Sequence, residues 1–121
     1  MNKIIINTSL LLVFGCASLF AQQENKQTTW HGFVKHSFVF EGRQARIVAP
    51  QQALPGNPWV WRAYFPDWHT DMDSILLSRG FHIAYIDCSD MFGSAEAMQV
   101  WEQFYDYLIR EKKFAEKPAL E

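Results

Sequence analysis

Apolar and polar side chains alternate along two neighbouring stretches of the chain. Residues 30–40 place Val34 and Phe38 on one face and Lys35 on the other, and residues 43–49 continue the alternation. A repeat of two residues is typical of β-strands. A Glu-Gly pair between the two stretches is a turn signal. We therefore expect an antiparallel β-hairpin with a short loop.

Two later stretches are apolar on both faces. Residues 59–65 are apolar except at Arg62, and residues 81–86 form the second such stretch. Strands that are covered on both sides have this pattern, so we expect two central strands. Residues 118–121 have the composition of the beginning of a further strand that enters the same sheet.

Helical spacing follows each central strand. Residues 70–79 start with Thr70 and Asp73 in a capping-box pattern. Residues 94–113 form a longer amphipathic segment that Ser94 is expected to cap. A hairpin followed by alternating strands and helices predicts an α/β fold, with a βαβαβ unit and a mostly parallel sheet.

The first 21 residues have the features of a secretory signal peptide. Lys3 gives a positive start, an apolar stretch follows, and Ala21 ends a suitable cleavage site. The alternative is a lipoprotein signal in which Cys16 is acylated, which would tether the protein to a membrane face. Both predict an exported protein, periplasmic or extracellular, without a transmembrane span. The polar residues 22–29 are expected to form a disordered leader.

Composition excludes some classes of function. The net charge is −2 and the basic residues are scattered, which argues against a nucleic-acid-binding face. Cleavage of the signal would leave Cys88 as the one thiol, so no intrachain disulfide is expected. Aromatic residues make up 16% of the chain, with five Trp. Rings in that number need a larger core than about 100 residues provide.

Four stretches resemble a known family. They are residues 58–66 (PWVWRAYFP), 68–70 (WHT), 79–87 (RGFHIAYID) and 91–94 (MFGS). In this order they resemble secreted bacterial α/β hydrolases of the prolyl-oligopeptidase-like or esterase-like group, which are serine hydrolases. The resemblance covers residues 30–121. It implies a partial domain, the N-terminal half of an α/β-hydrolase fold truncated before the nucleophile elbow.

The resemblance also implies how the catalytic groups are distributed. The family's serine, acid and histidine would all lie beyond Glu121, so no catalytic residue is expected here. One backbone N–H of the oxyanion hole would come from the turn after the first central strand, at Ala63, Tyr64 or Phe65. The Gly-rich form of this turn, frequent in the family, is absent.

Several side chains are expected near the pocket, each with a structural alternative. Arg62 is either one half of a structural ion pair, with Asp67, Asp87 or Asp90, or a clamp for an acidic substrate. No metal site or cofactor is expected, because helix capping accounts for the polar residues after His69. The candidate pocket-lining residues are Arg62, Trp68, His69, Asp90, Met91 and Phe92.

Two functions are compatible with these features. The first is the N-terminal fragment of a secreted serine hydrolase that acts on a small ester or peptide substrate and is inactive alone. The alternative is a small non-enzymatic module, secreted or lipid-anchored, that binds a glycan or a protein through exposed aromatic rings. The two differ in whether the Trp rings are packed in the core or gathered on an open face.

Overall fold

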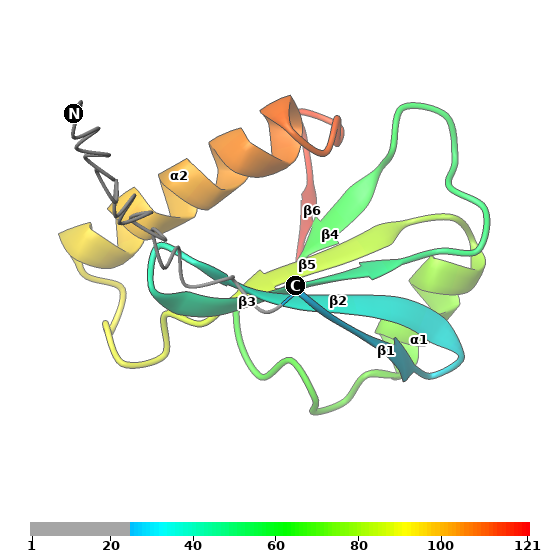
Figure 1. Cartoon of the computed structure of the whole chain (residues 1–121), viewed down its shortest axis with the longest axis horizontal. Coiled ribbons are helices and arrows are strands. Elements are labelled where there is room, and N and C mark those ends of the chain that lie inside the picture. Colours follow the sequence, from blue (N-terminus) through cyan, green and yellow to red (C-terminus); the bar gives the residue numbers. More distant parts are fainter. Residues whose placement is uncertain (1–24) are drawn as a thin grey trace, which may run out of the picture.

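The computed structural model describes residues 25–121, which form six strands and two helices (Figure 1). The signal sequence and Cys16 lie outside the described residues. The elements, in chain order, are β1 (Lys26–Trp30), β2 (Phe33–Phe40), β3 (Arg43–Ala49), β4 (Trp59–Trp61), α1 (Asp71–Ser78), β5 (His82–Ile86), α2 (Ala95–Arg110) and β6 (Ala119–Leu120).

All six strands belong to one mixed sheet. Their order across the sheet is β1-β2-β3-β5-β4-β6. The pairs β1/β2, β2/β3 and β3/β5 are antiparallel, whereas β4 is parallel to both β5 and β6. The predicted hairpin is confirmed as β2 and β3, with Phe40 opposite Arg43 at the turn.

The predicted fold class is wrong. Three of the five strand pairings are antiparallel and only two helices are present in residues 25–121, so a mostly parallel βαβαβ half of an α/β-hydrolase fold does not describe this chain. The physical reason lies in the first three strands. They form a continuous antiparallel meander, and its last strand pairs antiparallel with β5.

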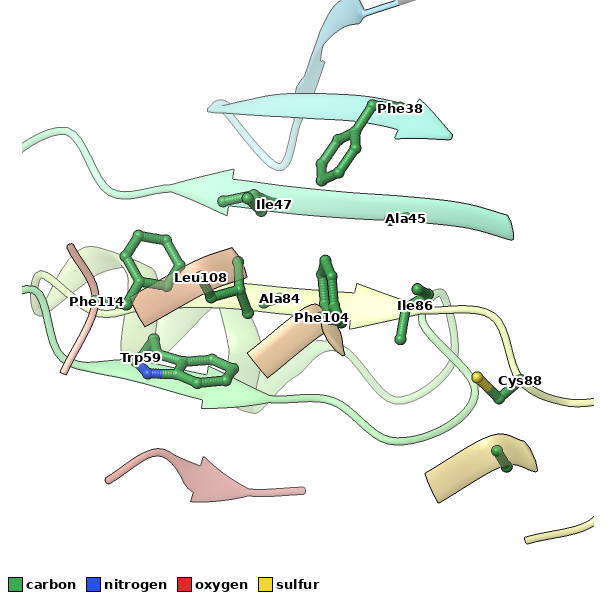
Figure 2. Packing of buried hydrophobic residues seen from close by; sticks show 11 residues of the cluster. Phe38, Ala45, Ile47, Trp59, Ala84, Ile86, Cys88, Phe104, Leu108 and Phe114 are labelled. Carbon is green, nitrogen blue, oxygen red and sulfur yellow. The ribbon is translucent and has the colours of Figure 1, made fainter. Parts of the chain in front are cut away.

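The larger core lies between the sheet and α2. Phe104 and Leu108 of α2 are fully buried, and Figure 2 shows them between Trp59 of β4 and Phe38 of β2. The indole of Trp59 donates a hydrogen bond to the Ala115 carbonyl at 2.7 Å. This bond satisfies the one polar atom of a buried ring and ties the segment after α2 to the sheet.

A smaller core lies on the opposite face, under α1. Leu77 of α1 packs there with Val48, Val60 and Ile83. Alternation within each strand divides the two cores, since Val60 follows Trp59 and Ile83 precedes Ala84. The sheet is therefore covered on both faces, which explains why the central strands are apolar throughout.

The helix ends agree with the sequence in part. Ser94 caps α2 as predicted, accepting a hydrogen bond from the Ala97 N–H at 3.3 Å. Thr70 precedes α1, but its side chain makes no capping bond and Asp73 turns into the protein instead. Gly80 ends the α1 turn at φ +96, and an added Cβ would lie 2.8–2.9 Å from atoms of Leu54 and Gln52. Only glycine fits there.

The segment before the hairpin differs from the expected disordered leader. Lys26–Trp30 form β1, which pairs with β2 from Lys26 opposite Ser37 to Trp30 opposite Phe33. In the part of the chain from residue 25 onward, neither helix has the length and apolar character needed to cross a bilayer.

Candidate functional site

Two loops leave the carboxyl ends of the neighbouring parallel strands β4 and β5. They cover residues 62–70 and 87–94, and the second leads directly into α2. Ligands in sheets with parallel strands commonly bind at this edge. Between the loops lies a cavity of about 230 Å³, lined by Ala63, Tyr64, Cys88, Ser89, Phe92, Gly93, Ala97 and Trp101.

Arg62 holds the first loop from the inside. Its guanidinium makes two hydrogen bonds to the Asp73 carboxylate, at 2.7 and 2.8 Å, and both side chains are buried. It also donates to the carbonyls of Phe65, at 3.0 Å, and Trp68. The structural ion-pair interpretation of Arg62 is supported, but the partner is Asp73 and not Asp67, Asp87 or Asp90. Arg62 is therefore not free to clamp a substrate.

The charge of Asp73 is set by its surroundings. Burial and the neighbouring Glu121 carboxyl raise the pKa of Asp73 and Arg62 opposes the rise, which together bring it to about 6. Glu121 also lies 3.4 Å from the Arg62 guanidinium. At neutral pH this leaves Asp73 ionised and paired, so the base of the loop holds a compensated charge.

Arg46 holds the same loop from the outside. Its guanidinium donates to Asp67 at 2.9 Å and to the Pro66 carbonyl, and it lies over the rings of Trp30 and Tyr85. Burial raises the pKa of Asp67, but the hydrogen bond and charge of Arg46 outweigh burial and bring the pKa below its usual value. The two arginines thus fix the loop before any ligand binds.

The backbone turn that follows β4 contains the candidate oxyanion donors. The Ala63 N–H donates to the Glu121 carbonyl at 2.9 Å and is used in the sheet. The candidate oxyanion donors are therefore the N–H groups of Tyr64 and Phe65. Tyr64 lines the cavity, and Phe65 is the next residue along the chain. Phe65 has φ 48 and His69 has φ 52. Such left-handed conformations are unfavourable for these residues and occur where surrounding contacts impose them.

Exposed aromatic rings gather on these loops. Tyr64 is 47% exposed, Phe65 55% and Trp68 61%, and Phe92 on the neighbouring loop is 95% exposed. The first three form a chain of edge-on contacts, with 4.3 Å between the Tyr64 and Phe65 ring centres and 5.5 Å between those of Phe65 and Trp68. His69 continues it at 4.2 Å from Trp68. Exposed rings in such a group mark a binding surface more often than single ones do.

The remaining predicted pocket residues lie on the second loop, and they point to different places. Asp90 forms an ion pair with Arg43 at 2.6 Å, away from the cavity. Met91 packs against the α2 core, and Phe92 lines the cavity. The hydroxyl and the N–H of Ser89 donate hydrogen bonds to the Asp87 carboxylate, at 2.6 and 3.0 Å. These bonds lower the pKa of Asp87. Of the predicted pocket residues, Phe92 therefore lines the cavity itself, and Trp68 and His69 belong to the exposed rings beside it.

A thiol and a hydroxyl, those of Cys88 and Ser89, are among the groups that line the cavity. Burial raises the pKa of the Cys88 thiol, which keeps it protonated and a poor nucleophile. No serine hydroxyl in residues 25–121 is hydrogen-bonded to a histidine. Within the same residues, no three His, Cys, Asp or Glu side chains converge as metal ligands.

Sequence reasoning missed several residues of this site, among them Arg46, Asp73 and Trp101. Arg46 is one polar position in an alternating strand, Asp73 resembled a capping residue, and Trp101 resembled part of the helix core. Alternation places Arg46 on the face of the strand opposite Ala45 and Ile47. Nothing in the sequence indicated which loop it would reach.

Comparison of the chain with protein-family models, with curated proteins and with solved structures gives no match.

Proposed function

We propose that this chain provides the substrate-binding face of a serine hydrolase that cleaves ester or peptide bonds. The observation that carries the proposal is the turn at residues 63–65, beside a small cavity at the carboxyl ends of parallel strands. Arg62 holds this turn through the Phe65 carbonyl, and Arg46 holds the residues that follow it, Pro66 and Asp67. Backbone N–H groups held in advance are what a developing oxyanion requires. Serine hydrolysis occurs on unrelated folds, so the proposal does not need the fold class that was first expected.

The roles of individual groups follow from their positions. The N–H of Tyr64 or Phe65 would donate to the carbonyl oxygen of the substrate. The rings of Trp68 and Phe92 would contact its apolar group. Because residues 25–121 hold no serine–histidine pair, the attacking serine must be supplied from outside them, and this chain alone should not turn over an ester.

The test uses N-acetyl-phenylalanine, which carries the carboxylate that cleavage of an ester or peptide would release. Titration into the ¹⁵N-labelled chain should move the amide-proton signal of Tyr64 or Phe65 downfield, because these groups would donate to the carboxylate. Trp68→Ala should weaken binding, whereas Met72→Ala, an exposed change on α1, should not. Shifts confined to other residues would contradict the proposal, as would ester turnover by the chain that a serine-directed inhibitor abolishes.

The exposed rings favour a second candidate, a non-catalytic glycan-binding module. Sugars stack on exposed aromatic faces, and Tyr64, Phe65, Trp68 and Phe92 provide such faces on neighbouring loops. A neutral trisaccharide would then move the side-chain signals of Trp68 and leave the amide protons of Tyr64 and Phe65 in place. N-acetyl-phenylalanine would have no effect.

Both candidate functions assume that the protein is exported. The signal expected over residues 1–21 supports a periplasmic or extracellular location, and acylation of Cys16 would add a membrane anchor. Fractionation of cells that express the tagged protein tests this. Recovery of the uncleaved chain in the cytoplasm would contradict it, and membrane association lost in Cys16→Ala would identify the anchor.

A further inference from the structure

A second cavity lies on the α2 face of the sheet, at the end opposite the two loops. His82, the first residue of β5, and Lys112, just after α2, both line it. Its volume is about 380 Å³, within the range of sites for small organic molecules. Neither the oxyanion turn nor the exposed aromatic rings contribute to it.

Aromatic rings form much of the cavity wall. Phe38 and Tyr107 lie with their ring centres 5.9 Å apart, and His82 and Phe114 lie 4.5 Å apart. Phe38 and Phe114 are themselves buried, so their positions are fixed by the core. Walls of this kind favour a flat ring, which can make offset or edge contacts with several of them at once.

The charge around the cavity has one sign. The Lys112 ammonium lies 5.9 Å from the Tyr107 ring centre, and no Asp or Glu is among the described residues that line the cavity. An ammonium beside apolar walls, with no carboxylate among the described residues that line the cavity, favours an anionic ligand. A single cation matches a single negative charge.

The His82 ring adds a neutral part of the wall. Burial lowers the pKa of His82, so the ring is neutral at pH 7. Its Nδ1 is buried and makes no hydrogen bond within residues 25–121. Because this nitrogen is closed off from solvent, a ligand in the cavity would meet other atoms of the ring.

We infer that this cavity binds a small aromatic carboxylate. The ring of the ligand lies against Phe38 and Phe114, and its carboxylate reaches Lys112. The site is separate from the proposed hydrolase face and does not depend on it.

The experiment is a titration of the ¹⁵N-labelled chain with 4-hydroxybenzoate. The expected result is saturable movement of the amide signals of His82, Tyr107 and Phe114, with those of Tyr64 and Phe92 unchanged. 4-Hydroxybenzamide has nearly the same shape without the charge. It should bind about tenfold more weakly, the size expected when a charge-assisted hydrogen bond is lost.

Two lysine variants make the test specific. Lys112→Gln should weaken binding of 4-hydroxybenzoate about tenfold and leave 4-hydroxybenzamide unaffected. Lys113→Gln changes the neighbouring lysine, which does not line the cavity, and should keep the wild-type affinity. Both lysines are exposed, so both variants should fold. Equal losses in the two variants, shifts centred on Tyr64 and Phe92, or a Kd weaker than about 1 mM would overturn the inference.

Discussion

The side chain of Arg62 is buried, and its guanidinium donates hydrogen bonds to several groups of the protein. It contacts the buried Asp73 carboxylate and the carbonyls of two loop residues, Phe65 and Trp68. Burying two charges is costly, and close pairing with further hydrogen bonds offsets that cost. The pair therefore contributes less to overall stability than its geometry suggests, but removal of one member leaves the other charge buried without a partner.

Replacement of Arg62 by Met tests this argument. We expect the free energy of unfolding to fall by about 3–5 kcal/mol, because Asp73 would remain buried without its cation. Urea unfolding followed by circular dichroism measures the change. Arg79→Met, at an exposed position after α1, should change the free energy by about 0.5 kcal/mol or less. A loss below about 1 kcal/mol for Arg62→Met would show that water reaches Asp73.

His82 predicts how stability depends on pH. Burial lowers the pKa of His82 in the folded protein below its ordinary value of 6.5, so between these two values the unfolded chain binds more protons. The contribution of the neutral ring is present above pH 6.5 and is lost as the pH falls toward the folded-state pKa. His82→Gln should therefore lose less stability than the wild type between pH 7.5 and 5.5. Parallel curves in urea unfolding would refute this assignment.

Among the elements, α2 carries the larger core and has a well-formed N-terminus. Ser94 caps it, Glu96 lies in its first turn and Arg110 in its last, as the helix dipole favours. Its buried residues Ala97, Phe104 and Leu108 follow a helical repeat that faces the sheet. Ser94 directly follows the loop that carries Phe92. The start of α2 and this loop therefore form one wall of the candidate site together.

Loss of that cap should have a measurable cost. Ser94→Ala leaves a helix N–H without its acceptor and should lower the free energy of unfolding by about 1 kcal/mol. Ser94→Asp keeps an acceptor and adds a charge that the helix N-terminus favours, so it should match or exceed the wild-type stability. Denaturant unfolding compares the three proteins. An equal loss in both variants would mean that the hydroxyl acts in some way other than capping.

Periodicity predicted which segments form helices and strands better than it predicted which strands lie next to each other in the sheet. The hairpin, both helices and the strand at residues 82–86 follow from alternation, helical spacing and caps. β1 was missed because its residues Lys26–Thr29 are polar, and an outer strand is held by backbone hydrogen bonds that do not depend on side-chain type. β4 is shorter than its apolar run, although the N–H groups of Arg62 and Ala63 still donate to neighbouring strands, and the chain leaves the sheet after Ala63.

The site was predicted less well for a related reason. The apolar strand at residues 81–86 predicted the loop with Phe92, whereas the turn at residues 63–65 came only from the resemblance to a family, since the apolar pattern extended the strand to residue 65. The ion-pair partner of Arg62 could not be identified, since Asp73 occupies a position that helix capping explains equally well. The antiparallel pairing of β3 with β5 was also beyond reach, because an apolar pattern records burial and not strand direction.

At the scale of the molecule, one sheet connects the two cores and the two candidate binding cavities. The candidate hydrolase site lies at the carboxyl ends of β4 and β5, and the cavity inferred to bind an aromatic carboxylate lies at the opposite end of β5 under α2. Both cores share the same strands, since successive residues of β4 and β5 face opposite helices. A change in one core therefore acts on the backbone that supports the other.

This sharing predicts that both layers unfold together. Leu77→Ala removes buried side-chain volume under α1 and should cost about 2–5 kcal/mol. Trp59, Trp61 and Trp101 belong to the α2 side, whereas Trp30 packs against the small core, so most of the buried tryptophans report on the α2 core. In urea, the midpoints from fluorescence and from far-ultraviolet circular dichroism should coincide in the wild type and move by the same amount in Leu77→Ala, because strand residues Val60 and Ile83 join the two layers. Separate midpoints would show that α1 and its small core detach while the α2 layer stays folded.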